Sequence, residues 1–326
     1  MMNFPRRHFL QLAGVAVAAA ALPRSAPALD YPTRPVRWVV GYPPGGPQDI
    51  VARLVGQFLS ERLGQQFIIE NRSGAGGNIG AEAVINAPPD GYTMLLVGSP
   101  NAINATLYDK LNFVFLRDIV PVASIGRAPL VMEVHPSVPA KTVPQFIAYA
   151  KANRGKINYA SAGTGTPQHV AGELFKMMAG VSMLHVPYRG AAPAMTDLIS
   201  GHVQAMFDPM PTAIEQIKAG RLRGLAVTTA KRAEVLPDLP AVSESLPGFA
   251  ADTWYGAGVP RNTPQEIVEA LNRGINAALG DARVKARLAD LGATVLAGTP
   301  ADFGRMLADE TEKWGRVVRA AGAKPE

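Results

Sequence analysis

Short apolar runs and helical hydrophobic stripes alternate along almost the whole chain, and this alternation constrains the fold more than any other feature. The run Val36–Val40 is typical of a strand that is buried on both faces. Apolar residues then recur at helical spacing from Ile50 to Leu59, and Gly64 marks the expected helix end. Further strands are expected at residues 67–70, 93–97, 158–160, 184–186, 203–207 and 225–227, with helices at 79–87, 143–153, 169–179, 193–200 and 212–219. This order predicts parallel sheets with helices on both faces.

Two proline-containing stretches interrupt the alternation. Val120–Val134 is apolar but has little helical period, and Leu236–Phe249 has the composition of a linker. After them we expect a strand at 254–259 and helices at 264–279, 281–291 and 301–321. Two α/β lobes joined by two crossings of the chain fit both junctions.

Three of the expected strands lead into glycine-rich loops without lysine, which cover residues 41–49, 71–78 and 161–168. Such loops direct backbone N–H groups and a helix N-terminus at one point, which favours an anion. Gly45 and Gly46 let the backbone approach a ligand closely, and Gln48 or Asp49 is a candidate cap for the next helix. The ligand is expected outside the carboxyl ends of the strands.

The third loop is rich in hydroxyl groups. Ser161, Thr164 and Thr166 fall within six residues, and their hydroxyls suit a carboxylate, which accepts about four hydrogen bonds. His169 is expected in the first turn of the following helix, where it supports the loop. Further polar candidates follow later strands: Tyr188, Arg189 and Asp208. The acidic Asp208 is expected to attract an amine or to hold ordered water.

The first 28 residues have the organisation of an export signal. Arg6-Arg7 precede an uncharged apolar run at residues 12–22, and a small-x-small cleavage site ends at Ala28. The run is shorter than the roughly 20 residues that a membrane span needs. Phe9-Leu10 after the two arginines favours the twin-arginine route over the general secretory route. We therefore expect a periplasmic protein that is cleaved near Ala28.

The sequence does not support several other functions. Removing residues 1–28 leaves 29 basic and 26 acidic residues, a net charge of +3, which does not suggest nucleic acid binding. There is no cysteine, so disulfides and thiol chemistry are excluded. The dinucleotide fingerprint fails at Ile79, where it requires glycine, and the histidines lack metal-ligand spacing. No G-x-S-x-G elbow occurs. We expect no catalytic residue, no metal and no cofactor.

In its motifs the chain resembles the Bug family, the extracytoplasmic solute receptors of tripartite tricarboxylate transporters in proteobacteria. The resemblance covers nearly all of the chain after the signal. It rests on Tyr31-Pro32-Thr33-Arg34-Pro35-Val36, Gly45-Gly46-Pro47-Gln48-Asp49 with Ala52-Arg53, Asn71 with Gly74-Ala75-Gly76-Gly77-Asn78-Ile79-Gly80-Ala81, Pro89-Asp90-Gly91-Tyr92-Thr93, His185-Val186-Pro187-Tyr188-Arg189-Gly190, Gly220-Arg221-Leu222-Arg223-Gly224-Leu225-Ala226-Val227-Thr228 and Leu236-Pro237-Asp238-Leu239-Pro240. One departure is Tyr42, because the family often has phenylalanine before the double glycine.

The resemblance implies a type II periplasmic-binding-protein fold, in which two doubly wound α/β lobes are joined by two crossover strands. Lobe 1 would comprise residues 29–125 and 250–326, and lobe 2 residues 126–249. In this family a carboxylate is held in the cleft by the loops that match 41–49 and 161–166. The ligand-binding residues expected on this basis are Tyr42, Gly45, Gly46, Asp49, Ser99, Asn101, Ser161, Gly163, Thr164, Gly165, Thr166, His169, Tyr188, Gly190 and Asp208.

The expected role is capture of a small organic carboxylate by lobe closure and its delivery to membrane permease subunits. The ligand class includes dicarboxylates, tricarboxylates, aromatic acids and amino acids, and the receptor is expected to be a monomer. Two alternatives remain open. In the first alternative, the chain is a receptor of the same fold that serves a sensor kinase. In the second, which its residues favour least, the chain is a hydrolytic enzyme.

Overall fold

The computed structural model describes residues 30–325, so the expected signal peptide at residues 1–28 lies outside the described residues. The strands are β1 (Val36–Val40), β2 (Phe67–Asn71), β3 (Thr93–Gly98), β4 (Ile119–Val134), β5 (Asn158–Ser161), β6 (Leu184–Pro187), β7 (Ala205–Pro209), β8 (Arg223–Val227), β9 (Asp252–Pro260) and β10 (Thr294–Val295). The helices are α2 (Pro47–Leu63), α3 (Asn78–Ile85), α4 (Ser99–Leu107), α5 (Phe115–Asp118), α6 (Val143–Ala152), α7 (Pro167–Ala179), α8 (Ala191–Ile199), α9 (Met210–Lys218), α10 (Gln265–Gly280), α11 (Ala282–Asp290) and α12 (Pro300–Ala321).

Two short 3₁₀ turns, η1 (Ala75–Gly77) and η2 (Val242–Glu244), complete the secondary structure described for residues 30–325. Most helix and strand predictions are confirmed to within two residues. Within the same residues, no helix is both long enough and apolar enough to cross a membrane.

The strands pair in the order β2-β1-β3-β9-β4-β7-β5-β6, and β8 and β10 also pair with β4. Strands β1, β2 and β3 are parallel to one another, as are β7, β5 and β6. The prediction of wholly parallel sheets is wrong for the two long strands, since β9 runs antiparallel to β3, and β4 runs antiparallel to β7, β8 and β9. A chain that leaves one lobe and later returns must run through the junction in both directions.

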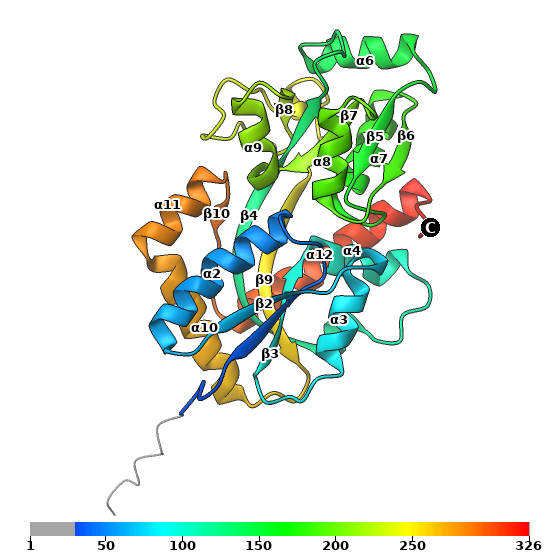
Figure 1. Ribbon diagram of the computed structural model, residues 1–326. Coiled ribbons are helices and arrows are strands. Elements are labelled where there is room, and N and C mark those ends of the chain that lie inside the picture. Colours follow the sequence, from blue (N-terminus) through cyan, green and yellow to red (C-terminus); the bar gives the residue numbers. More distant parts are fainter. Residues whose placement is uncertain (1–29, 326) are drawn as a thin grey trace, which may run out of the picture. The chain divides into compact units, whose positions relative to one another are not determined.

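Strand β4 is the first of these crossings. Its residues from Ile119 to Pro129 pair with β9, whereas Leu130–Val134 pair with β7 and β8. One strand therefore belongs to both lobes, which Figure 1 shows as a long ribbon between them. The expected proline-rich junction at residues 120–134 is thus a strand. Its pairing with β9 shifts register between Pro121 and Ala123, where proline cannot donate to the ladder.

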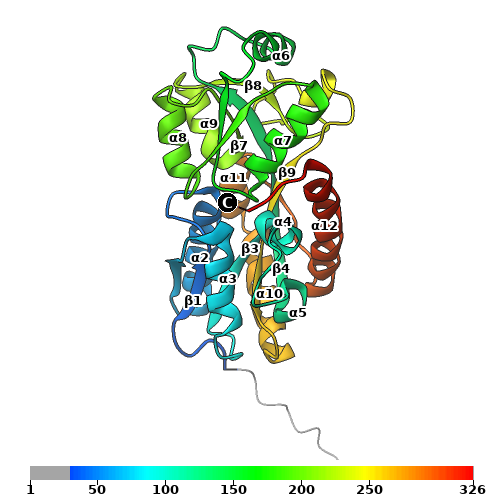
Figure 2. The same cartoon turned by 90° about the vertical axis from the view of Figure 1, so that its right-hand side faces the viewer.

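Lobe 1 contains β1–β3 with α2, α3 and α10, and lobe 2 contains β5–β8 with α6–α9 (Figure 1). In lobe 2 the ring centroids of Phe175 on α7 and Phe207 on β7 lie 5.4 Å apart, which packs the helix against the sheet. In lobe 1 the Trp254 ring of β9 meets Phe303 of α12 edge-on at 6.1 Å. This contact fixes the C-terminal helix to lobe 1, where α12 lies beside α4 and β4 (Figure 2).

Helix α4 was not expected from the sequence. Pro100 stands in its first turn, where a proline costs no hydrogen bond, and the Asn101 side chain accepts a 2.9 Å hydrogen bond from the Gly98 backbone N–H. Its residues show no apolar stripe because seven of the nine, including Asn104, are buried. The helix closes the carboxyl end of β3 and so places Asn104 near the glycine-rich loops.

Candidate functional site

The first two glycine-rich loops contact each other at the carboxyl ends of β1 and β2. The Tyr42 hydroxyl donates a 2.8 Å hydrogen bond to the Gly76 carbonyl, and Asn71 Nδ2 donates to the Tyr42 carbonyl at 2.9 Å. A Cβ at Gly41 would lie 2.9 Å from the Gly77 Cα, so the backbones approach as closely as glycine allows. Burial raises the pKa of Tyr42, which therefore stays a neutral donor.

The third loop, from lobe 2, meets this pair. A Cβ at Gly76 would lie 3.3 Å from the Thr164 carbonyl oxygen, and one at Gly165 would lie 2.5 Å from Asn104 Oδ1. Beside them, a Cβ at Gly190 would lie 2.8 Å from Pro43 Cδ. Gly165 and Gly190 both have positive φ, at 83° and 129°. The loops of both lobes are therefore in contact, and side chains larger than glycine would hold them apart.

Three polar atoms are buried at this meeting point without a hydrogen-bond partner among the described residues. They are Asn78 Nδ2, Asn104 Oδ1 and Thr164 Oγ1. Asn104 Nδ2 donates to the Gly76 carbonyl at 2.8 Å and to Asn78 Oδ1 at 3.1 Å, which fixes the orientation of both amides. A buried polar atom without a partner costs about 1–3 kcal/mol. Two donors and one acceptor from the two lobes thus have no partner among the described residues.

Asp49 supports the first loop from below. Its carboxylate accepts hydrogen bonds from the Gly45 N–H at 3.0 Å, from Asn71 Nδ2 at 2.9 Å and from two Arg53 nitrogens at 2.9 Å. Burial alone would raise the pKa of Asp49, but the bonds from Arg53, Gly45 and Asn71 outweigh it and lower the pKa. The prediction that Gln48 or Asp49 caps α2 is wrong, because α2 begins after Gly46 without a side-chain cap.

Two histidines stack beneath the third loop. The His169 and His185 rings lie 4.2 Å apart, and His185 stacks on Tyr159 at 5.0 Å. His169 Nδ1 accepts the Gly165 N–H at 3.2 Å, so it supports the loop from the first turn of α7, as expected. Burial, reinforced by the neighbouring His169 ring, lowers the pKa of His185 to about 3. Burial also lowers the pKa of His169, although Glu173 opposes this shift. Both rings are therefore neutral at pH 7.

The hydroxyls of the third loop have different roles. Ser161 Oγ lies 2.6 Å from His185 Nε2, and Thr166 Oγ1 donates to the Gly163 carbonyl at 2.7 Å. These two hydroxyls stabilise the loop itself. Only the Thr164 hydroxyl, among the three expected to bind a ligand, is left without a partner in the described chain.

The remaining predicted residues lie at different places. Asn101, Tyr42 and Gln48 line a cavity of about 10 Å³ between β3 and the first loop, enough for about one water. Ser99 Oγ accepts the Trp254 N–H at 3.0 Å and so joins α4 to β9. Tyr188 turns its hydroxyl to Asp197 at 2.7 Å, and burial with this bond raises the pKa of Tyr188 to about 12. Asp208 is fully buried at the end of β7.

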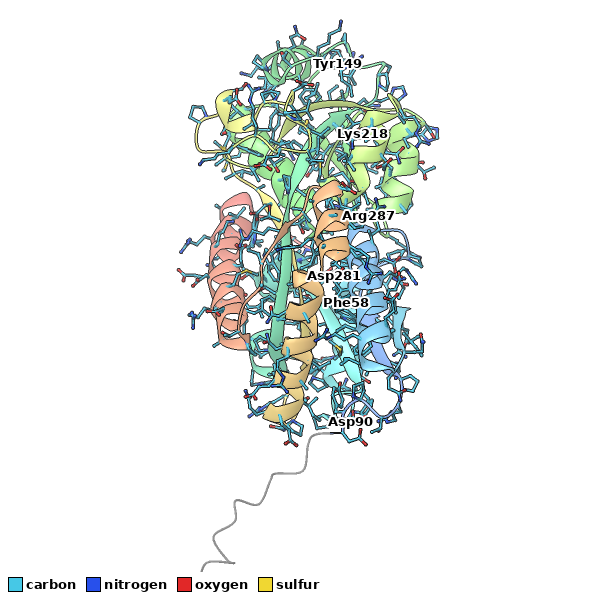
Figure 3. All side chains as sticks on the ribbon, turned by 90° about the vertical axis from the view of Figure 1, so that its left-hand side faces the viewer. Phe58, Asp90, Tyr149, Lys218, Asp281 and Arg287 are labelled. Atoms are coloured by element: carbon cyan, nitrogen blue, oxygen red, sulfur yellow. The ribbon has the colours of Figure 1, made fainter. Side chains whose placement is uncertain are left out.

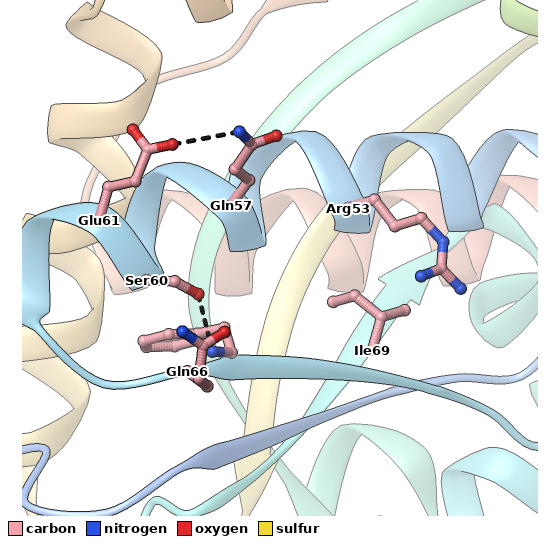
Figure 4. Close-up of a pocket in the computed structure, with 7 residues that line it drawn as sticks. Arg53, Gln57, Ser60, Glu61, Gln66 and Ile69 are labelled. Atoms are coloured by element: carbon pink, nitrogen blue, oxygen red, sulfur yellow. Dashed lines mark hydrogen bonds between the residues drawn. The ribbon is translucent and has the colours of Figure 1, made fainter.

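A larger groove of about 460 Å³ lies elsewhere, on the outer side of lobe 1 between α2 and β2 (Figure 4). Its polar groups largely bond to one another, such as Gln57 Nε2 to Glu61 Oε1 at 3.1 Å and the Phe67 N–H to Ser60 Oγ at 2.8 Å. None of its lining residues belongs to the three loops, although Arg53 bonds Asp49 and Asn71. Residues 30–325 hold no group of three or more side chains suited to a metal ion.

Asn78 and Asn104 were not among the predicted ligand residues. Asn78 is the last residue of the second loop, so its position in a candidate loop could have indicated it. Asn104 gave no signal, because α4 itself was not predicted. Its role depends on the packing of α4 against η1, which places its amide between Gly76 and Gly165.

Comparison with known proteins agrees with this geometry. A family model described as a tripartite tricarboxylate transporter family receptor matches residues 51–323. The chain is 36% identical over 326 residues to the protein BugT of Bordetella pertussis, with 99% of both chains covered. A structure of an R. palustris protein with adipate has a TM-score of 0.88 and 38% identity, covering 91% of this chain and all of that one. MatC from Rhodopseudomonas palustris with bound malate has a TM-score of 0.84 and 33% identity, covering 88% of this chain and all of that one.

Proposed function

The chain belongs to the tripartite tricarboxylate transporter receptor family, and from this premise we propose that it binds a small dicarboxylate between its lobes for delivery to membrane permease subunits. The bound adipate and malate of two similar structures support a linear dicarboxylate as the ligand class. A periplasmic location follows from the family, and we propose cleavage of the signal near Ala28. We propose that the receptor works as a monomer.

The observation that carries the proposal is the cluster of buried unpartnered polar atoms where both lobes meet. Asn78 Nδ2 from lobe 1 and Thr164 Oγ1 from lobe 2 are donors that one carboxylate can bridge. Backbone N–H groups at the starts of α2 and α7 add donors and a favourable dipole. A ligand that bridges both lobes would stabilise their closure.

The predicted ligand residues follow from this proposal. Gly45, Gly46, Gly163, Gly165 and Gly190 act through their backbones, which approach the ligand closely because they carry no side chain. We propose that Tyr42, Asn101 and Tyr188 shape the distal part of the site, and that the buried Ser99 and Asp208 support it from behind. For the lobes we propose the boundaries 29–125 with 250–326, and 126–249, which place the division within β4 and before β9.

A thermal-shift screen of residues 29–326 tests the proposal. Adipate, malate, longer and shorter dicarboxylates and their diamides would be compared. A ligand at about 100 times its Kd stabilises the folded state by about 2.7 kcal/mol, which raises the melting temperature. Stabilisation by an acid but not by its diamide is the expected result. No shift with any carboxylate, or equal shifts with the amides, would contradict the proposal.

Mass spectrometry of the released ligand tests the enzymatic alternative. We expect the ligand to be released chemically unaltered.

A further inference from the structure

Two carboxyl groups are buried together in lobe 2 near the proposed site. Glu133 lies on β4 and Asp208 at the end of β7, and both are fully buried. Asp208 pairs in register with Val131, two residues before Glu133 on the same face of β4. The two carboxyls are therefore diagonal neighbours across adjacent strands, within reach of each other.

No cation compensates either group. No ion pair among residues 30–325 includes Glu133 or Asp208, and neither Glu133 oxygen has a hydrogen-bond partner there. Asp208 accepts hydrogen bonds from the neutral groups Thr212 Oγ1 and, at 3.4 Å, Gln168 Nε2. The buried Tyr255 on β9 lies near enough that the Asp208 charge adds to burial in raising the pKa of Tyr255.

The charged groups on α7, α8, α9 and β8 bond elsewhere or are exposed. On α7, Glu173 accepts hydrogen bonds from Lys176 and from the Tyr159 hydroxyl. On β8, Arg223 donates to the Val138 and Ala140 carbonyls. On α8, Asp197 accepts the Tyr188 hydroxyl. On α9, Glu215 and Lys218 are exposed, and Figure 3 shows Lys218 at the outer end of the helix. The clusters beside the pair are apolar and include Val131, Ile214, Met195 and Met206.

Two neighbouring carboxyls in such surroundings cannot both be charged, so they titrate as one unit that retains a proton. Burial raises the pKa of Asp208 to about 7, against the opposing bonds from Thr212 and Gln168. Burial and the Asp208 charge raise the pKa of Glu133 well above its usual value. Near neutral pH, the proton occupancy of the pair can therefore change.

The pair is coupled to the ligand loops through Gln168. This residue is the last of the third loop and lies in the first turn of α7, and its side chain bonds Asp208. Asp208 therefore lies beside the start of α7, which is one of the two helix N-termini that the proposed anionic ligand uses. A second negative charge near this point raises the cost of ionising the pair.

We propose that the Glu133–Asp208 pair takes up a proton when an anionic ligand binds, so that ligand affinity rises as the pH falls through neutrality. The inference rests on the proposed function, because only an anion at the loops would shift the proton equilibrium. The Glu133–Asp208 pair is then a proton site that lies behind the ligand loops. Above the midpoint of the titration, affinity would fall by up to about tenfold per pH unit, the limit for uptake of one proton.

Calorimetry with a dicarboxylate hit, in buffers of different ionisation enthalpy, counts the protons taken up. We expect uptake of a fraction of one proton at pH 7.5 and none at pH 5, where the pair is already protonated. Asp208→Asn should bind with no uptake at either pH. Glu133→Gln should retain uptake, because a protonated Glu133 carries no charge when Asp208 ionises. Thr212→Val should retain uptake with its midpoint moved to higher pH, because the Thr212 hydroxyl no longer stabilises the charged form of Asp208. Asp252→Asn is the matched control, since this half-buried carboxyl pairs with Arg127 and should leave the uptake unchanged.

Uptake that persists in Asp208→Asn, or wild-type affinity that does not vary with pH, would overturn the inference. If Asp208→Asn does not fold, the shift in Thr212→Val decides, and an unchanged midpoint there contradicts the inference. If no dicarboxylate binds at any pH, the proposed function fails and the coupling with it. Carbon NMR titration of side-chain carboxyls in the ligand-free protein then shows separately whether the pair holds a proton at pH 7.

Discussion

Ser161 Oγ lies 2.6 Å from Nε2 of His185, so the third glycine-rich loop is bonded to a neutral imidazole that itself stacks between His169 and Tyr159. Three stacked rings therefore support the third loop from beneath. The Ser161 hydroxyl is bonded to one of these rings, that of His185. The hydroxyl of Thr164, three residues later, has no partner among the described residues, and we propose that it bonds the ligand.

Substituting His185 with glutamine should destabilise the protein in a pH-dependent way. The pKa of His185 is lowered to about 3 in the fold, so its neutral form contributes stability above the unfolded pKa of about 6.5, and this contribution is lost as the pH falls below it. His185→Gln loses the stacking, worth about 1 kcal/mol, but adds no titrating group. We expect a lower unfolding free energy at pH 7.5 and a smaller difference near pH 5, measured by urea denaturation. If the difference in unfolding free energy between wild type and variant increases as the pH falls, His185 does not have a lowered pKa in the fold.

Removing the Thr164 hydroxyl should weaken ligand binding while leaving stability intact. Thr164→Val preserves the shape of a side chain whose hydroxyl is buried without a partner. Loss of one hydrogen bond to a charged ligand costs about 1.5–3 kcal/mol, or about 10- to 100-fold in Kd by calorimetry.

Thr166→Val is the matched control for this experiment, because its hydroxyl bonds the Gly163 carbonyl. That variant should lose about 1 kcal/mol of stability. If Thr164→Val lowers the melting temperature as much as Thr166→Val and binds ligand normally, Thr164 has no role in binding.

Local sequence patterns predicted the helices and strands but not how the strands pair. The strand Val36–Val40 and the helix that ends at Gly64 were predictable because period, apolar content and a left-handed glycine all act within a few residues. Residues 119–134 carried the same apolar signal, yet their pairing with β9 in one lobe and with β7 and β8 in the other depends on residues more than 70 positions away. A junction was foreseen at this point, and the strand was not.

The glycine-rich loops after the strands could be predicted for the same reason, since a glycine run acts locally. The different bonding of their side chains could not. Thr164 and Thr166 look equivalent in sequence, and only the fold shows that one hydroxyl is bonded and the other is not. Likewise Glu133 is an acid within an apolar run, and its burial beside Asp208 follows from the register of two strands.

Replacing Asp49 should disorder the first loop. The carboxylate joins Gly45, Asn71 and Arg53, and its pKa is lowered. It therefore contributes stability above the unfolded pKa of about 3.9, which is lost as the pH falls through the lower folded value. Asp49→Ala should cost about 1–3 kcal/mol at pH 7 and weaken ligand binding, with a much smaller stability cost near pH 2.5.

A suitable control for Asp49 is Glu70→Gln. Glu70 also bonds two arginines, Arg37 and Arg72, but these pairs are more exposed. Its substitution should change the unfolding free energy by less than about 1 kcal/mol. Equal costs at the two positions would mean that Asp49 contributes only as a surface ion pair.

Replacing Glu133 with methionine should stabilise the protein at high pH. Neither oxygen of Glu133 has a partner, and burial raises its pKa in the fold. The carboxyl thus favours the folded state most below its unfolded pKa of about 4.3, and this contribution is lost as the pH rises towards the higher folded value. Methionine has a similar shape and no charge, so Glu133→Met should raise the melting temperature more at pH 8 than at pH 5. Glu310→Met is the contrasting variant, because Glu310 is also buried but accepts hydrogen bonds from Arg127 and Trp314 Nε1. Its loss leaves Arg127 with one fewer partner and should destabilise the fold by about 3–5 kcal/mol. If both variants lower the melting temperature at pH 8, Glu133 has a partner that keeps its carboxylate charged.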